Sequence, residues 1–448
     1  MGSKCNIVKL KEVVDVITSK VDVSLINISD YISTENMLTD FQGTTLANNI
    51  PNSGKITRFS QGDILFSNIR TYFKKIWLAD RPGACSNDVI VFRPKNNIES
   101  EYVFSILMDP KFTDHTVLTS KGTKMPRGDK KAILDYEFNL ASNEERKYIS
   151  KINNIIFKKI NCNKLINSTL EQMSQTLFKS WFVDFDPVID NALDAGNPIP
   201  EALQSRAELR QKVRNNANFK PLSADIRVLF PDEFEETELG WVPKGWESDT
   251  FDSFCDFIQS GGTPSRKETS FWNDGTIKWL SSGEVKGKIV LDTKEKITET
   301  GILHSSAKLW KKFTTVVAMY GATAGEVCII GDKMTANQAC CGLYSEKHPF
   351  YVYNVVNDKA DELASKATGS AQQNLNKLII SSTKFIRPSN SIITTFEDNV
   401  APLFLKWFSN SSENNTLTNL RDTLLPKLIS GELSLEDLPD IIKQTEAA

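Results

Sequence analysis

The sequence contains no run of 18 apolar residues, so it predicts no membrane-spanning helix. Its first ten residues, MGSKCNIVKL, lack the apolar segment of a secretory signal. Cysteine is also scarce: the chain has 7 in 448 residues, and no two of them are spaced as C-x-x-C. Together these absences predict a protein of a reducing, cytoplasmic compartment whose thiols lie mostly in cores.

The motifs of several enzyme classes are missing as well. The sequence has neither the G-x-x-x-x-G-K-[ST] loop of ATPases nor a G-x-G-x-x-G loop after a predicted strand. It has no N-P-P-[YF] or D-P-P-[YF] motif of amino-methyltransferases, and DFDPV at 184–188 is not one. The three histidines, His115, His304 and His348, lack metal-ligand spacing. We therefore predict no catalytic residue and no metal site in the isolated chain.

What is present is ordinary for a globular protein: 40% of the residues are hydrophobic and 24% are charged, and 448 residues predict two or three domains. The charge is distributed unevenly. Residues 1–182 hold 25 Lys and Arg against 19 Asp and Glu, whereas residues 183–245 hold 7 against 12. A basic first half permits a polyanionic partner, although a solvated surface is the commoner reason for such an excess.

Two passages of the chain repeat at a fixed distance. The stretch KGTKMPRGDKKAILDYEFNLAS (121–142) aligns with TGSAQQNLNKLIISSTKFIRPS (368–389), which lies 247 residues further on. The same offset aligns NSTLEQMSQTLF (167–178) with NNTLTNLRDTLL (414–425). A shared offset over about 60 residues indicates an internal duplication.

A weaker match lies upstream of these passages. ILFSN (64–68) resembles VVAMY (316–320) at an offset of 252, and Asn87 resembles Asn337 at an offset of 250. Short β-branched and aromatic runs such as VIVF (89–92) alternate with turn residues, as strands of a mixed fold do. The predicted fold class is α+β, with two pseudo-symmetric mixed α/β domains separated by two long antiparallel helices that form a coiled-coil-like spacer.

A long helix is predicted after each domain, over 143–182 in the first half and about 391–430 in the second. Ser142 followed by Glu145 fits a capping box at the start of the first helix. Residues seven apart form a seam on each helix, with Asn at the third position of both. The seam residues are Ile149, Ile156, Asn163, Leu170 and Leu177 in the first helix and Phe396, Leu403, Asn410, Leu417 and Leu424 in the second.

A buried Asn in such a seam costs stability but fixes register and orientation. We therefore predict that the two helices pair antiparallel, with Asn163 and Asn410 near the middle of the pair. The alternative is two separate helices, each packed on its own domain. The linker between the halves is predicted to hold one helix around 200–214.

The end of the first helix carries more aromatic area than one surface helix needs. In QTLFKSWFVDFDPV (175–188), the aromatic residues are Phe178, Trp181, Phe182 and Phe185. Exposed aromatic patches mark interaction sites, so a partner protein could cover these rings. The alternative is an intramolecular core between this helix and the linker that follows it.

Three passages together resemble the specificity (S) subunit of Type I restriction–modification systems. TLFKSWFVDFDPV (176–188) looks like its central conserved region, and TLLPKLISGEL (423–433) is similar to its C-terminal conserved helix. FPDEFEETELGWVPKGWE (230–247), followed by SGGTP (260–264), resembles the entry to its second target-recognition domain. The resemblance covers nearly the whole chain and agrees with the duplication.

The resemblance implies six segments. They are target-recognition domain 1 (1–141), the first conserved spacer helix (142–183), a central linker region (184–245), target-recognition domain 2 (246–390), the second conserved spacer helix (391–433) and a C-terminal tail (434–448). Each recognition domain would read one half of a bipartite double-stranded DNA target, and the helices would set the spacer that is not read.

The resemblance also implies a non-catalytic subunit that works in a complex. Two methyltransferase subunits would dock on the conserved regions, with Phe178, Trp181, Phe182 and Phe185 as the expected partner-binding residues, and restriction subunits would join them. The cofactors S-adenosylmethionine, ATP and Mg²⁺ would be used by those partners. The expected location is the cytoplasm of a bacterium or archaeon, with no membrane partner.

Candidate DNA-binding residues are basic or amide side chains in turn-rich stretches, because Lys and Arg bind phosphates while Asn, Gln and Arg discriminate base edges. In the first half they are Ser67, Asn68, Arg70, Lys74, Lys121, Lys124, Arg127 and Lys130. In the second half they are Thr263, Ser265, Arg266, Tyr320, Gln372, Gln373, Asn374 and Lys377. For each single residue, an ordinary solvated loop is the alternative.

Two other functions remain open at this point. A stand-alone DNA-binding regulator would bind its site tightly without a partner and would need no aromatic belt at the helix ends. A protein-interaction scaffold would show no salt-dependent DNA affinity. The DNA target itself does not follow from the sequence.

Overall fold

The computed structural model describes residues 6–367, 375–430 and 432–433, and the chain divides into two compact units. Unit 1 comprises Met1–Cys162 and Asn414–Ala448, and unit 2 comprises Asn163–Glu413. The division falls inside both long helices, because each helix contributes one part to the core of each unit. None of the helices in the described residues is long and apolar enough to cross a membrane.

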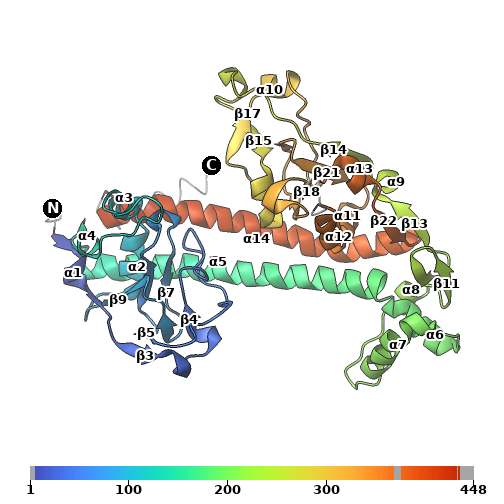
Figure 1. Ribbon diagram of the computed structural model, residues 1–448, viewed down its shortest axis with the longest axis horizontal. Helices are drawn as coiled ribbons and strands as arrows, with labels where there is room; N and C mark the ends of the chain where they lie inside the picture. Colours follow the sequence, from blue (N-terminus) through green and yellow to red (C-terminus); the bar gives the residue numbers. More distant parts are fainter. Residues whose placement is uncertain (1–5, 368–374, 431, 434–448) are drawn as a thin grey trace. The chain divides into compact units, whose positions relative to one another are not determined.

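Unit 1 contains two four-stranded sheets (Figure 1). The first has the order β2 (Val14–Val16), β9 (Val89–Pro94), β6 (Ile64–Ser67) and β7 (Ile76–Leu78), with all neighbours antiparallel. The second has the order β3 (Lys20–Asp22), β5 (Lys55–Phe59), β8 (Gly83–Cys85) and β4 (Tyr31–Ile32). Helix α2 (Ser100–Met108) packs on the first sheet beside β7 and β9, and α3 (Pro110–Leu118) follows it.

Unit 2 also has two sheets, with one strand more in the main sheet and one strand fewer in the second. Its main sheet has the order β14 (Phe257–Ser260), β21 (Cys340–Tyr344), β18 (Thr315–Ala318), β19 (Val327–Ile330) and β16 (Ile289–Val290). Its second sheet has the order β17 (Glu295–Ile297), β15 (Ile277–Leu280) and β20 (Thr335–Ala336). Helix α11 (Pro349–Asp358) packs beside β18, β19 and β21, and α12 (Ala360–Ala367) follows it.

A short strand pair precedes the long helix in each unit. In unit 1, β1 (Ile7–Lys9) pairs with β10 (Glu137–Asn139), and in unit 2, β13 (Glu247–Thr250) pairs with β22 (Lys384–Arg387). The remaining short elements of the two units are α1 (Leu10–Val13), α4 (Lys130–Leu134), α9 (Phe251–Phe254), α10 (Glu299–Leu303) and α13 (Lys377–Ser381). The 247-residue offset holds exactly from α4 and α13 to the first residues of the long helices, which confirms the duplication in this region.

The upstream part of the repeat has a different offset from the one predicted. The Val89 N–H donates to the Ser86 carbonyl at 3.1 Å, and the Cys340 N–H donates to the Asn337 carbonyl at 3.1 Å, so equivalent residues lie 251 apart. The strand pairs agree with this offset, since Ile64 pairs with Phe92 and Thr315 with Leu343. The predicted alignments of ILFSN with VVAMY and of Asn87 with Asn337 are therefore wrong by one residue. Side chains on a strand alternate between two faces, so a shift of one residue exchanges the buried and exposed sets.

The long helices are α5 (Asn143–Phe178) and α14 (Asn390–Ser430). The capping box at the start of α5 is confirmed: the Ser142 N–H donates to Glu145 Oε2 at 2.8 Å, and the Glu145 N–H donates to Ser142 Oγ at 3.3 Å. Helix α5 itself ends at Phe178, and a π-helical turn, η4 (Lys179–Val183), follows it. The helix predicted to end at residue 182 therefore includes most of this turn.

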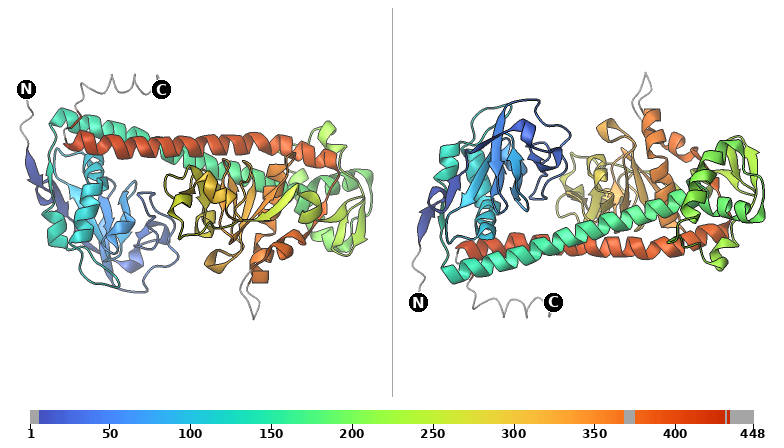
Figure 2. Two further views of the ribbon diagram at one scale, coloured as in Figure 1. Left: turned by 90° about the horizontal axis from the view of Figure 1, so that it is seen from above. Right: turned by 90° about the horizontal axis from the view of Figure 1, so that it is seen from below.

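In each unit, the part of α5 and the part of α14 that belong to it lie side by side and antiparallel (Figure 2). None of the ten predicted seam residues is exposed. In unit 2, Asn163 Nδ2 donates to Glu413 Oε2 at 2.8 Å, and Asn410 Nδ2 donates to Asn167 Oδ1 at 2.9 Å. Asn163 and Asn410 are each 1% exposed, so the two helices meet in a buried polar layer.

The linker between the halves belongs to unit 2. It holds α6 (Asp186–Ala195), α7 (Glu201–Arg214), α8 (Ala224–Arg227) and the hairpin of β11 (Phe234–Thr237) and β12 (Gly240–Pro243). The helix predicted around 200–214 is α7. A second helix, α6, was not predicted, because its proline lies at the start of the helix, where a missing N–H costs nothing.

Candidate nucleic-acid interface

Two loops of unit 1 that hold the predicted DNA-binding residues are joined by backbone hydrogen bonds. One loop connects β6 to β7, and the other precedes α4. The Arg70 N–H donates to the Pro126 carbonyl at 2.8 Å, and the Gly128 N–H donates to the Asn68 carbonyl at 3.1 Å. The structure therefore brings two stretches about 60 residues apart in sequence into one surface, which we call the unit 1 loop surface.

The second of these loops is closed by its own hydrogen bonds. Lys121 and Arg127 exchange N–H to carbonyl bonds of 2.8 and 2.9 Å. The Lys121 ammonium pairs with Asp129, and the Arg127 guanidinium pairs with Asp88 at 3.0 Å. The Lys121 hydrogen bond, with backbone N–H groups at the start of α4, lowers the pKa of Asp129. Both cations remain well exposed, at 79% for Lys121 and 59% for Arg127.

Four other predicted cations of this surface have no ion pair within the described residues. Lys124 and Lys130 are exposed, and Arg70 and Lys74 are half-buried. An unpaired cation on a surface loop can bind a phosphate without first breaking an internal ion pair. The unit 1 loop surface is therefore strongly basic, as the sequence predicted.

Ser67 and Asn68 lie beneath this surface. Ser67 is 2% exposed, because it is the last residue of β6, and its hydroxyl donates to the Ile69 carbonyl at 3.4 Å. Ser67 thus shapes the loop from below, and its DNA contact stays a prediction. Asn68 is 9% exposed, and its Oδ1 atom has no hydrogen-bond partner in the described part of the chain. That acceptor faces Gly128, where an added Cβ would lie 2.7 Å from it.

Two aromatic residues of the same loop were not predicted as site residues. Tyr72 and Phe73 are 47% and 38% exposed, and their ring centroids lie 4.7 Å apart. Aromatic rings among basic residues are typical of surfaces on which nucleic-acid bases stack. In the sequence LFSNIRTYFKK, the two adjacent aromatic residues next to basic ones could have indicated these site residues.

Unit 2 joins its equivalent loops in the same way. The Leu375 N–H donates to the Met319 carbonyl at 2.9 Å, which is the counterpart of the bond from Gly128 to Asn68. Tyr320 follows Met319 and is 38% exposed, and Lys377 is exposed at the start of α13. Gln372, Gln373 and Asn374, predicted to read bases, lie outside the described residues.

The predicted set Thr263, Ser265 and Arg266 precedes β15 in unit 2. Thr263 Oγ1 donates to Gln338, and Ser265 is exposed. The Arg266 guanidinium lies 3.6 Å from the ring centroid of Trp272 and pairs with Glu295, an ion pair that lowers the pKa of the Glu295 carboxyl. Arg266 is thus neutralised within unit 2, and its DNA contact stays a prediction. Glu295 and Gln338 lie 29 and 75 residues further along the chain than the residues they contact, so no local signal could reveal these two partners.

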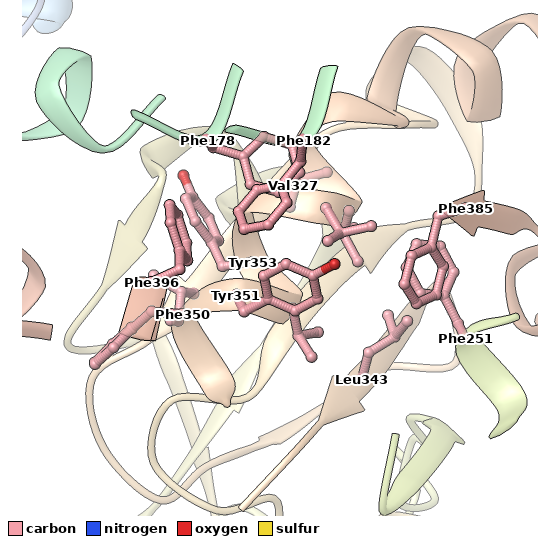
Figure 3. Packing of buried hydrophobic residues seen from close by; sticks show 14 of the residues in the cluster. Phe178, Phe182, Phe251, Val327, Leu343, Phe350, Tyr351, Tyr353, Phe385 and Phe396 are labelled. Carbon is pink, nitrogen blue, oxygen red and sulfur yellow. The ribbon is translucent and has the colours of Figure 1, made fainter. Parts of the chain in front are cut away.

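The aromatic residues at the end of α5 are covered by the chain itself. Phe178, Trp181, Phe182 and Phe185 are between 2% and 8% exposed. Their partners are Phe230, Trp246, Tyr351 and Phe396. The ring centroids of Phe182 and Phe396 lie 5.0 Å apart, and those of Trp181 and Phe230 lie 5.2 Å apart. Figure 3 shows Phe178 and Phe182 pointing toward Tyr351 and Phe396.

This burial favours the intramolecular alternative, and the partner-binding role of Phe178, Trp181, Phe182 and Phe185 stays a prediction. The intramolecular alternative is what the structure shows, because the linker and α14 supply the aromatic rings that cover them. Burying rings of this size supplies a large part of the core energy of unit 2.

A ladder of ion pairs, which the sequence reading missed, holds α7 against α6. Aspartates four residues apart face arginines four apart: Asp186, Asp190 and Asp194 oppose Arg206, Arg210 and Arg214. The central pair is bidentate, with Arg210 Nε 2.9 Å from Asp190 Oδ1 and Arg210 Nη2 2.5 Å from Asp190 Oδ2. The matched spacing of the two sets along the sequence was the available signal.

Comparisons with known proteins agree with the repeated architecture. A family model described as Type I restriction modification DNA specificity domain matches residues 3–172 and 243–416. The Type I restriction enzyme HindI specificity subunit of Haemophilus influenzae is 27% identical over 401 residues, which cover 83% of this chain and 87% of the relative. The MjaIX specificity subunit of Methanocaldococcus jannaschii is 23% identical over 386 residues, covering 85% and 79%.

Among solved structures, a Type I restriction–modification S subunit from M. genitalium has a similar fold. Its TM-score is 0.54 at 13% sequence identity, and the match covers 95% of this chain and 96% of that one. At this level of identity the match is one of fold. The two stretches matched by the family model each contain one strand repeat and part of one long helix.

Proposed function

We infer that this chain, which belongs to the Type I restriction modification DNA specificity family, is the DNA sequence-recognition subunit of a Type I restriction–modification enzyme. It carries two recognition domains, one in each unit. The observation that carries this conclusion is the duplication itself: the family model matches twice, and each match holds the same sheet with two loops joined at the end of the same strand.

The chemistry of DNA recognition fits two such loop surfaces. A single protein surface reaches only a few base pairs in the major groove, so two surfaces are needed for a longer target. Phosphate contacts by Lys and Arg position a domain, and contacts to base edges specify the sequence. We propose that each loop surface reads one half of a bipartite target, with Lys124, Arg127 and Lys130 among the contacts of unit 1.

Helices α5 and α14 each contribute residues to both units. We propose that these helices set the length of DNA between the two half-sites. Their buried polar layer of Asn163, Asn167 and Asn410 would hold the register of the helices, because any shift would leave buried amides without partners.

We propose that the chain itself is non-catalytic and acts in the cytoplasm as part of a complex. Its partners would be two methyltransferase subunits and, in the full enzyme, restriction subunits. Those partners would use S-adenosylmethionine, ATP and Mg²⁺. The missing motifs of ATPases and amino-methyltransferases in this sequence support this division of labour.

Methylation mapping tests the proposal directly. The chain is expressed with its methyltransferase partner, and methylated adenines are located across a host genome. We expect one bipartite motif that disappears when the chain is omitted. Replacing residues 1–141 with the equivalent domain of another family member should change one half of that motif and leave the other half intact. A motif that persists without the chain, or two unchanged halves, would contradict the assignment.

A further inference from the structure

Two residues of the unit 1 loop surface adopt a left-handed backbone conformation that L-amino acids rarely take. Arg70 has φ 50° and ψ 59°, and Lys74 has φ 52° and ψ 42°. In this conformation the Cβ atom crowds the following carbonyl, and glycine avoids the crowding because it has no Cβ. Both residues border the short helix η3 (Thr71–Phe73), which lies between β6 and β7.

Unit 2 builds the same turn with glycine at both positions. Gly321 and Gly325 lie 251 residues after Arg70 and Lys74, which is the offset of the flanking strands, and their φ values are 72° and 88°. One bond of the turn is shared, because the Phe73 N–H donates to the Arg70 carbonyl at 2.9 Å and the Ala324 N–H donates to the Gly321 carbonyl at 3.1 Å. The second bond differs: the Lys74 N–H donates to the Thr71 carbonyl, whereas the Gly325 N–H donates to the Ala318 carbonyl. The turn therefore requires a left-handed backbone at these two positions, whereas the side chains there can differ.

Unit 1 thus carries a conformational cost that unit 2 avoids, and the charged ends of the two side chains form no internal bond that would offset it. Neither the Arg70 guanidinium nor the Lys74 ammonium forms a hydrogen bond or ion pair with any residue in the described ranges. Neighbouring Lys121 and Arg127, by contrast, are paired with Asp129 and Asp88. Strained residues persist at sites of function when the surrounding structure enforces them.

We propose that Arg70 and Lys74 bind DNA phosphates and that unit 1 holds its half-site through them, whereas the equivalent glycine turn of unit 2 makes no cationic contact. The two half-sites are then held by different chemistry. Unit 1 contributes the salt-dependent part of the affinity at this turn, because each phosphate that a cation neutralises releases counterions. This inference deepens the proposed function and depends on it.

The test replaces Arg70 and Lys74, singly and together, with the residue that unit 2 has at the same place. Arg70→Gly and Lys74→Gly should leave the thermal midpoint of unfolding unchanged or raise it, since the strain is removed. Each should weaken binding to the methylated target duplex about tenfold at physiological salt and reduce the slope of log K against log salt by about 1. The measurement uses the full chain in complex with its methyltransferase subunits.

Two matched variants separate charge from backbone. Arg70→Ala removes the charge but keeps a Cβ, so it should weaken binding as Arg70→Gly does without the gain in stability. Arg70→Lys keeps the charge and should retain the salt slope. If Arg70→Gly lowers the unfolding midpoint and leaves the salt slope unchanged, Arg70 has a purely structural role and the inference is wrong.

DNA binding by the wild-type complex distinguishes a failure of this inference from a failure of the proposed function. If it binds the duplex that methylation mapping identifies, and the double glycine variant binds with the same affinity and slope, only the inference about Arg70 and Lys74 fails. If the wild-type complex shows no salt-dependent binding to that duplex, the proposed function fails as well.

Discussion

The main sheets of the two units share a strand order and pairing, apart from the added β16 of unit 2, and they differ in the residues at the end of the same strand. β6 leads into a turn that holds Arg70 and Lys74, and β18 leads into one that holds Gly321 and Gly325. Backbone hydrogen bonds fix the shape of both turns, so their side chains are free to differ. The comparison teaches that a duplicated scaffold can present two chemically different loop surfaces without a change in its backbone.

The units also differ in how they bury the long helices. In unit 1, α5 and the end of α14 contribute mostly aliphatic residues, among them Ile149, Leu425 and Leu428, together with the ring of Phe157. In unit 2, the end of α5 and the start of α14 pack mainly through aromatic rings, because Phe230 of the linker and Trp246 directly after it join this core. The linker is thus part of the unit 2 core as well as a connection between repeats.

The largest expected effect is on this aromatic core. Trp181 is 2% exposed, and Trp181→Ala should lower the free energy of unfolding by about 4 kcal/mol, because it leaves a cavity among aromatic rings. Chemical denaturation measures the loss, and hydrogen exchange should locate it in unit 2. Val183→Ala, two residues away and 40% exposed, is the control and should change stability by less than about 0.5 kcal/mol. A loss below about 1 kcal/mol for Trp181→Ala would show that the aromatic cluster is not a packed core.

The second expected effect is a pH dependence that Glu397 gives unit 2 and that has no counterpart at the equivalent position of unit 1. Glu397 of α14 accepts the backbone N–H groups of Phe350 and Tyr351 at 3.0 and 2.8 Å, at the start of α11. Burial raises the pKa of Glu397 from 4.5 to about 7, against the opposing effect of those hydrogen bonds. At the equivalent position 247 residues earlier, unit 1 has Ser150, whose hydroxyl has no partner in the described part of the chain.

Because folded Glu397 keeps its proton to a higher pH than the unfolded chain does, its contribution to the free energy of unfolding falls as pH rises from about 4.5 to about 7. The total loss is up to about 3 kcal/mol at about 1.4 kcal/mol per pKa unit. Glu397→Gln removes the titration, so the variant should gain stability relative to the wild type across this range. Denaturation of both proteins at several pH values measures the difference, and a difference that does not change with pH would exclude the titration of Glu397.

The fold and the candidate site could be predicted from the sequence where the residues that indicate them lie close together in the chain or recur at a fixed spacing. The start of α5 has its capping residues within three positions, and the 247-residue repeat spans enough residues to fix its offset. The heptad spacing likewise placed Asn163 and Asn410, which the structure buries in one polar layer. Such patterns depend on residues that are close in sequence or regularly spaced.

The features that were missed depend on residues far apart in the chain. The strand match was wrong by one residue, because a stretch with only three apolar residues, such as ILFSN, aligns almost equally well in two registers. The aromatic rings at the end of α5 are covered by Phe230, Trp246 and Phe396, which no local pattern connects to them. The burial of Ser67 likewise followed from which way the last residue of β6 faces.

The smallest expected effect comes from substitutions in the unit 2 turn, which measure the cost of the left-handed conformation that both turns share. Gly321 has φ 72°, and an added Cβ would meet no atom within 4 Å, so Gly321→Ala measures the cost of the left-handed conformation alone. We expect this variant to lose about 1 kcal/mol in chemical denaturation. Gly325→Ala should lose more, because its Cβ would lie 2.7 Å from the Cβ of Ala364. If Gly321→Ala costs nothing, the conformation is not strained, and the reason for assigning Arg70 a role beyond the fold disappears.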